Sequence, residues 1–144
     1  ADVAYVDPPY NQHSYLGNYH VWESLVRWDK PAVYGVACKR ADVRERRSVF
    51  NSRRGAAAAL ARLLAAIRAP VLLVSFSNEG FVRREAMEAL LASLGDGRAV
   101  VTRSERDGRR YVGAQIGIYN PRGEKVGAVS HLHNTEYLYL VSRP

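Results

Sequence analysis

The residues of this sequence best suited to chemistry stand in its first ten positions, which end in Asp7-Pro8-Pro9-Tyr10. The apolar run from Val3 to Val6 predicts a short buried strand. Proline lacks a backbone N–H and fixes its own φ, so the two prolines end that strand at a rigid point. Asp7 is held extended because it precedes a proline. We therefore expect a carboxylate, rigidly placed carbonyls and an aromatic ring at the carboxyl end of a strand, the edge where open α/β sheets bind ligands.

The elements that position this motif are predicted from apolar periodicity. The run at 71–76 predicts a second buried strand, and helical spacing of apolar residues from Leu60 to Ile67 and from Met87 to Leu94 predicts helices on either side of it. The order strand, helix, strand, helix is typical of a parallel α/β sheet. Ser77 or Asn78 is the expected N-cap of the second of these helices.

The segments between and after these elements are less regular. Asn11 to His20 has neither helical nor strand period and is predicted to be a loop, and Val21 to Trp28 a short helix. Ala32 to Ala37 is predicted to be a short extended piece. The last third predicts strands, which would close the parallel sheet with antiparallel pairs. Their expected ranges are 99–102, 111–119, 125–129 and 136–141.

Composition places the chain among globular proteins of one domain. It has 144 residues, 47% of them hydrophobic, with one cysteine and no apolar run long enough to span a membrane. The single Cys38 excludes a disulfide framework, and a cytoplasmic protein is the simplest interpretation. The chain opens at Ala1, in the middle of the predicted strand and without a methionine, which suggests a fragment of something longer.

The positive charge is concentrated in two stretches. The net charge is +7, of which residues 39–54 carry +5 and residues 98–110 carry +3, so the remainder sums to −1. Solubility alone could account for either stretch. Two such stretches beside a candidate catalytic motif favour a polyanionic partner.

The motif and its surroundings resemble the carboxyl-terminal half of a Dam-type adenine-specific (N6) DNA methyltransferase that uses S-adenosyl-L-methionine. The resemblance is carried by residues 7–14 (Asp-Pro-Pro-Tyr-Asn-Gln-His-Ser), 75–80 (Ser-Phe-Ser-Asn-Glu-Gly) and 134–138 (Asn-Thr-Glu-Tyr-Leu). It implies a Rossmann-like α/β methyltransferase sheet, with parallel strands and a closing antiparallel hairpin. An aspartate at position 7 fits enzymes that methylate adenine N6; serine is usual in N4-cytosine enzymes.

The resemblance also implies roles for individual residues. The carboxylate of Asp7 and the carbonyl of Pro8 would accept the two hydrogens of the target amine, Pro9 would keep the turn rigid, and Tyr10 would stack on an adenine flipped out of double-stranded DNA. Asp7 would also border the cofactor. No metal site is expected. The residues expected to contact nucleic acid are Asn11, Ser14, Tyr15, Arg40, Arg44, Arg46, Arg47, Arg53, Arg54, Arg109 and Arg110.

The sequence departs from the family in one large respect. Members hold the cofactor with a glycine-rich loop after a strand, and neither that loop nor a target-recognition region is present in residues 1–144. We therefore expect the catalytic half of a methyltransferase domain, inactive on its own, in a monomeric protein. A restriction endonuclease partner is left open. The alternatives are an RNA guanine-N2 methyltransferase, a basic DNA-binding remnant of the fold, and a purely structural Pro-Pro turn with Tyr10 in the core.

Overall fold

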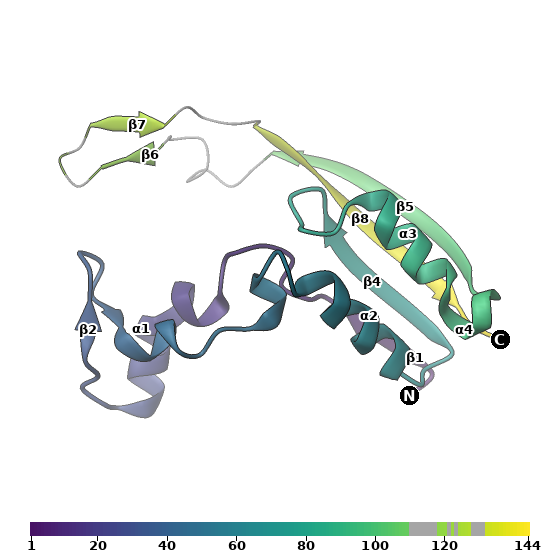
Figure 1. The fold of residues 1–144 in the computed structure, drawn as a ribbon, viewed down its shortest axis with the longest axis horizontal. Coiled ribbons are helices and arrows are strands. Elements are labelled where there is room, and N and C mark those ends of the chain that lie inside the picture. The colour runs from purple at the N-terminus through teal and green to yellow at the C-terminus, as the bar shows by residue number, and fades with distance from the viewer. Residues whose placement is uncertain (110–117, 121, 123, 128–131) are drawn as a thin grey trace.

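A computed structural model describes residues 1–109, 118–120, 122, 124–127 and 132–144. Its centre is a four-stranded sheet in the order β1-β4-β8-β5 (Figure 1). β1 and β4 are parallel, with Val6 opposite Val74, while β8 runs antiparallel to both of its neighbours, β4 and β5. The bounds are Val3–Val6 for β1, Val71–Ser77 for β4, Val100–Arg109 for β5 and His133–Ser142 for β8.

Three helices lie between the strands of this sheet in the chain, one before β4 and two after it. The two longer helices cover one face of the sheet (Figure 1). Leu72 and Val74 of β4 lie on that face, together with Tyr139 of β8, and all three are fully buried. They pack in one apolar cluster with Leu64 and Met87 from the helices. The helices are α2 (Ala56–Ala66), α3 (Arg84–Ala92) and the short α4 (Leu94–Gly97). This packing fixes the strand ends that precede the candidate site.

The opposite face of the sheet is apolar and accessible. Tyr5, Leu73 and Leu140 stand side by side across β1, β4 and β8. Tyr5 is 63% exposed and Leu140 is 43% exposed.

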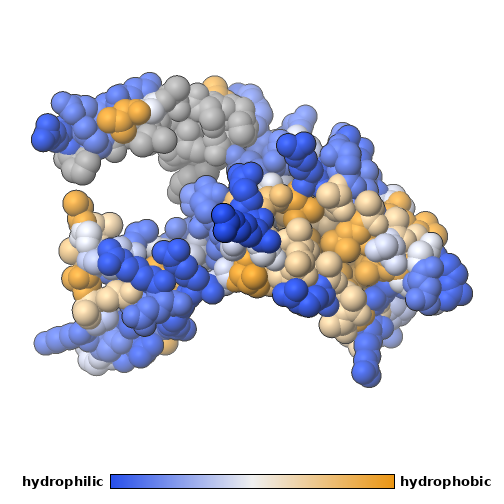
Figure 2. Space-filling model, in the orientation of Figure 1, coloured by the Kyte–Doolittle hydropathy of each residue, from blue (hydrophilic) through white to orange (hydrophobic). Residues whose placement is uncertain are grey.

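A polar arm extends from the sheet between β1 and α2. It consists of a helix, a two-stranded ribbon and two short 3₁₀ helices. In Figure 2 the visible side of the arm is mostly hydrophilic, with some apolar residues between the hydrophilic ones. The elements of the arm are α1 (Tyr15–Arg27), β2 (Val33–Tyr34), β3 (Lys39–Arg40), η1 (Ala41–Arg44) and η2 (Val49–Asn51). A second ribbon pairs β6 (Ile118–Tyr119) with β7 (Lys125–Gly127).

The parallel pair of strands at 3–6 and 71–77 and the helices between and after them confirm the sequence prediction, as does the antiparallel pairing of the last described strands. The predicted helix at 21–28 is confirmed and extends further back. The predicted loop at 11–20 is wrong from Tyr15 onward, because the hydroxyl of Ser14 accepts a hydrogen bond from the Gly17 amide and caps a helix there. The predicted extended piece at 32–37 keeps only Val33–Tyr34 as strand.

The N-cap prediction at Ser77 or Asn78 is also wrong. Ser77 completes β4, where it pairs with Glu136, and α3 begins seven residues later at Arg84. The strand predicted at 99–102 extends to Arg109, since β8 provides a partner along its whole length. Most of the strand predicted at 111–119, and the end of the one at 125–129, lie outside the described residues.

Candidate active site

The motif Asp7-Pro8-Pro9-Tyr10 leaves the sheet at the carboxyl end of β1. The last paired residue is Val6, which is buried opposite Val74. Asp7 is exposed and Pro8 is buried, so the carboxylate faces outward from a turn that is anchored in the core. The prolines leave this turn without backbone donors at positions 8 and 9 and fix the φ angle at both residues.

Tyr10 is held on two sides by the segment that follows β4. Its ring is tilted by 60° against Phe76, with 5.7 Å between ring centroids. Its carbonyl accepts a 2.8 Å hydrogen bond from the Phe81 amide. Gly80 permits this arrangement, since a Cβ there would lie 2.3 Å from Cε1 of Phe76. Tyr10 therefore packs on the core and remains half-buried at the edge of the sheet.

Acidic side chains surround Tyr10 from three elements of the site. Burial raises the pKa of the Tyr10 hydroxyl, and the charges of Glu136, Glu79 and Asp7 raise it further. Burial also raises the pKa of Glu136, a hydrogen bond from Ser77 opposes that rise, and the nearby Glu79 and Asp7 add to it. The carboxylate of Glu136 accepts a second hydrogen bond, of 2.8 Å, from the side-chain Nδ2 of Asn134.

Glu136 was missed by the sequence analysis as a site residue. The resemblance includes residues 134–138, but it implies no role for any of them. Glu136 reaches the motif because β8 inserts between β4 and β5, which places Glu136 directly opposite Ser77 at the end of β4. This strand order is a tertiary feature that cannot be predicted from the local spacing of residues in the sequence.

The loop after Tyr10 is tied to the arm by an amide. Asn51 of η2 donates through Nδ2 to the carbonyls of Asn11 and His13, at 2.8 Å and 3.1 Å. The side-chain oxygen of Asn11 accepts a hydrogen bond from the backbone N–H of His13 at 3.0 Å. The hydroxyl of Ser14 accepts the hydrogen bond that caps α1. Tyr15 stacks on Tyr19 with 6.3 Å between centroids. Of the expected DNA-contacting residues, Asn11, Ser14 and Tyr15 thus stand next to the motif.

Arg40 lies inside the arm. Its side chain is only 3% exposed, and its guanidinium donates to Asp29 at 2.6 Å and 2.9 Å and to Asp42 at 3.1 Å. It also donates to the hydroxyl of Ser24 at 3.1 Å. The hydrogen bond from Arg40 holds the pKa of both aspartates below their usual value. The guanidinium therefore makes its hydrogen bonds inside the arm, where they join α1 to β3 and η1.

The other expected arginines of the arm are exposed. Arg46 pairs with Glu23 at 3.3 Å and with Asp42 at 3.6 Å. Arg44 lies over the ring of Tyr34, 3.8 Å from its centroid, and Arg47 donates to the Arg44 carbonyl at 3.1 Å.

Two further arginines follow the arm, and two lie at the end of the sheet. Arg53 lies 5.3 Å from the ring centre of Phe81, the residue bonded to Tyr10, and its neighbour Arg54 is exposed. Arg109 ends β5 opposite His133, and Arg110 lies outside the described residues.

Comparison with known proteins identifies the segment that carries the motif and the arm. The family model of the D12 class N6 adenine-specific DNA methyltransferase matches residues 1–66. These residues belong to that family. The match includes β1, the whole arm and α2, so the exposed Asp7 and the ring of Tyr10 stand within a D12-class segment.

Several modification methylases resemble a larger part of the chain. Type II methyltransferase M.FokI of Planomicrobium okeanokoites is 35% identical over 94 residues, which cover 65% of this chain and 14% of that protein. Modification methylase StsI of Streptococcus sanguinis is 31% identical, covering 63% of this chain and 14% of StsI. Type II methyltransferase M.CviAII of Paramecium bursaria Chlorella virus 1 is 30% identical, covering 73% of this chain and 31% of M.CviAII. The chain thus spans about a seventh to a third of these relatives. No solved structure matches it.

A D12-class methyltransferase needs a site for its methyl donor, and the sequence analysis expected a glycine-rich loop after a strand for this purpose. Gly95 and Gly97 stand in α4 with positive φ, after a helix and not after a strand. No described strand of the sheet is followed by a Gly-x-Gly turn. The described residues therefore do not form a cradle for the donor. Among them there is also no cluster of potential metal ligands and no helix long and apolar enough to cross a membrane.

Proposed function

We propose that this chain carries the catalytic edge of a site-specific DNA methyltransferase that transfers a methyl group from S-adenosyl-L-methionine to N6 of adenine in double-stranded DNA. The observation that carries the proposal is the placement of Asp7 and Pro8, in the D12-class segment, at the carboxyl end of a core-anchored parallel strand. The finer assignment of the sheet as Rossmann-like belongs to the same proposal. It is supported by the parallel β1–β4 pair and the antiparallel closing pair.

The chemistry needs two acceptors at one spot. The exocyclic amine of adenine is a poor nucleophile because its lone pair is delocalised into the ring. The Asp7 carboxylate and the Pro8 carbonyl would each accept one N–H and draw the nitrogen toward tetrahedral geometry, so that its lone pair becomes available. Because Pro8 is buried and the turn is rigid, these acceptors are in place before the base arrives.

Charge around the amine supports the same assignment. The nitrogen gains positive charge as it forms its new bond, and carboxylates near it stabilise that charge. Asp7, Glu79 and Glu136 gather around Tyr10 from the turn after β1, the turn after β4 and β8. The ring of Tyr10, fixed by Phe76, would stack on the extruded base.

The test is the product made on DNA by the intact protein that contains residues 1–144. Incubation with S-adenosyl-L-methionine and plasmid DNA, followed by nuclease digestion and mass spectrometry, should show N6-methyladenine. Asp7→Ala should lower the rate by ~10²–10³, as when other preorganised transition-state contacts are removed, and should leave DNA affinity nearly unchanged. N4-methylcytosine, or methylation of RNA alone, would overturn the proposal.

A further inference from the structure

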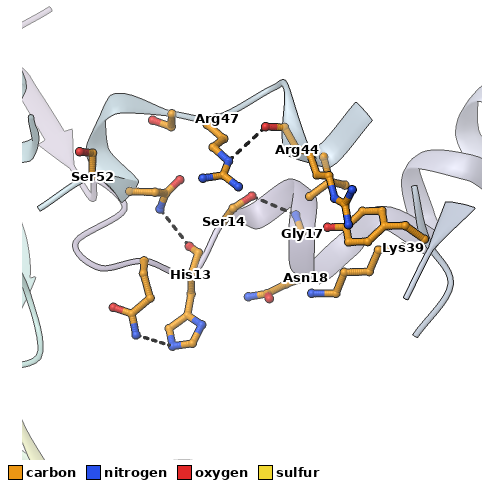
Figure 3. A pocket seen from close by; sticks show the side chains of 13 residues that line it. His13, Ser14, Gly17, Asn18, Lys39, Arg44, Arg47 and Ser52 are labelled. Atoms are coloured by element: carbon orange, nitrogen blue, oxygen red, sulfur yellow. Dashed lines mark hydrogen bonds between the residues drawn. The ribbon is translucent and has the colours of Figure 1, made fainter. Parts of the chain in front are cut away.

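A pocket of about 500 Å³ lies in the arm, beside the loop that follows Tyr10. Its wall is formed by the segment 12–18, by the ribbon β2–β3 and by the chain from η1 to η2. Figure 3 shows Arg47 and Lys39 extending into this space from separate segments, with Ser14 and Asn18 on the helix side. The pocket is distinct from the acceptors Asp7 and Pro8, which do not line it.

The lining of the pocket is cationic and contains no carboxylate. Lys39, Arg44 and Arg47 all contribute to it, together with hydroxyl and amide groups. Elsewhere in the arm the arginines are neutralised, Arg40 by two aspartates and Arg46 by Glu23 and Asp42. Within the described part of the chain, no carboxylate lies within ion-pair distance of the three pocket cations. Three cations of the arm for which no ion pair is found among the described residues therefore line this one pocket.

The two arginines of the pocket are held in place by neutral groups. The guanidinium carbon of Arg44 lies 3.8 Å from the centre of the Tyr34 ring, a neutral partner that uses none of its N–H donors. Arg47 uses Nε to bond the Arg44 carbonyl, and its two terminal nitrogens remain for another acceptor. A guanidinium presents its donors in a planar fork that matches two oxygens of a phosphate. Neighbouring Ser48 and Ser52 add hydroxyl groups to the wall.

The position of the pocket relates it to the target base. Asn51, which lines the pocket, is bonded to the carbonyls of Asn11 and His13. His13, which also lines the pocket, follows Tyr10 by three residues, so the Cα atoms of these two residues lie within roughly 11 Å of each other. This distance is of the order of a nucleotide, which places the pocket beside the sugar–phosphate chain of a base bound at Asp7 and Tyr10.

We propose that this pocket binds one backbone phosphate of the target strand next to the flipped adenine, through Arg44, Arg47 and Lys39. The proposal rests on the proposed function for the place of the base. An extruded base as the occupant fits less well, because Tyr34, the larger of the two aromatic rings in the lining, is already covered by Arg44. A phosphate contact carries no sequence information, and its effect is to fix the register of the strand while its base is out of the helix.

The experiment measures binding of the full chain to a labelled 30-base-pair duplex by fluorescence anisotropy over a range of salt concentrations. The duplex contains a site that the protein methylates or, if no methylation is found, a mixed sequence. The variant Arg44→Gln/Arg47→Gln should reduce the slope of log K against log salt by about 0.9, the value for one phosphate. The matched control is Arg27→Gln/Arg84→Gln, which removes two exposed arginines that are paired with carboxylates and are not among the expected DNA contacts. The control should leave the slope unchanged.

Single methylphosphonate replacements then locate the phosphate. In the wild-type protein, one replacement beside the target adenine should weaken binding roughly ten-fold or more, the loss expected for hydrogen bonds to a charged group. The pocket variant should lose nothing further at that position. Equal slopes in the pocket and control variants, or losses that add in the pocket variant, would overturn the proposal. An intact protein that binds DNA in this way but makes no N6-methyladenine would refute the proposed function and leave the phosphate pocket standing.

Discussion

The ring of Tyr10 rests against the ring of Phe76 at 5.7 Å, and this contact joins the turn after β1 to the strand β4. Because Phe76 is 4% exposed and belongs to the apolar core, Tyr10 has one side fixed by the fold. A half-buried aromatic ring in this position unites two interpretations that the sequence left as alternatives, a core aromatic residue and a stacking platform. The two functions are compatible because a ring has two faces.

Substitution of Tyr10 separates the ring from its hydroxyl. Tyr10→Phe keeps the contact with Phe76 and should retain most methylation activity. Tyr10→Ala should lose ~5–150-fold, since stacking on one aromatic ring contributes about 1–3 kcal/mol per base. Steady-state methylation rates of the intact protein on matched duplex DNA provide the measurement.

The same pair of variants can be compared on DNA with the target adenine in a mismatch. Flipping is cheaper there, so Tyr10→Ala should recover a measurable part of its loss. Equal losses on both substrates, or a phenylalanine variant as inactive as the alanine variant, would assign Tyr10 to packing or to a hydroxyl contact.

Gly80 should act as a positioning residue for Tyr10. A Cβ at this residue would lie 2.3 Å from Cε1 and 2.8 Å from Cζ of Phe76, so Gly80→Ala should displace the ring that supports Tyr10. We expect a loss of about 1–3 kcal/mol in the free energy of unfolding, as for other overpacked sites, and a lower kcat with little change in DNA affinity. Gly108→Ala is the control, since its Cβ would meet only Asn134 at 3.6 Å. An unchanged kcat in Gly80→Ala would show that the support of Phe76 is dispensable.

Arg40 should stabilise the arm and not bind DNA. Arg40→Met removes the common partner of Asp29 and Asp42, and should lower the urea midpoint at pH 7. Because the hydrogen bond from Arg40 lowers the pKa of both aspartates, its stabilisation is present above their ordinary pKa of 3.8 and is lost as the pH falls through their lowered values. The difference between wild type and variant should therefore shrink below about pH 4.

Arg46→Met is the control for Arg40, because Arg46 reaches Asp42 from the exposed side, with 54% of its side chain accessible. Exposed pairs of this kind contribute little to stability. Equal urea midpoints for the two variants would show that burial of Arg40 has no special effect. A change in the salt dependence of DNA binding in Arg40→Met at full folding would return this residue to the DNA interface.

The local elements and the motif were predictable because they depend on short-range physics. Alternating or helical apolar spacing gave both parallel strands and the helices α2 and α3, and Pro8 with Pro9 fixed the end of β1. The early start of α1 was also local, since Ser14 is a favourable N-cap, but the apolar period of that helix is weak and hid it.

What could not be predicted is long-range. The stretch 39–54 has a net charge of +5 in the sequence, yet Arg40 is buried, Arg46 is paired with carboxylates, and Arg44 and Arg47 line a pocket. The division depends on Asp29 and Glu23, which lie on or after α1 and meet the stretch only when the arm folds. The place of Glu136 depends in the same way on the strand order β1-β4-β8-β5.

Glu136 should destabilise the fold in its charged form. Burial is the main reason that its pKa is raised, and the neighbouring Glu79 and Asp7 act in the same direction. A carboxyl group whose pKa is higher in the folded state than the ordinary 4.5 contributes stability below that value and loses the contribution as the pH rises through the folded pKa. Glu136→Gln cannot ionise and keeps an oxygen that can accept from Asn134 or Ser77. Its urea midpoint should therefore exceed that of the wild type at pH 7 and match it near pH 4, while Glu124→Gln, an exposed control, should match the wild type at both. If the same variant also lowers kcat at pH 7 without weakening DNA binding, the carboxylate assists the amine that becomes positively charged. A glutamine variant less stable than wild type at pH 7 would instead show that the hydrogen bonds from Ser77 and Asn134 outweigh the burial of the charge.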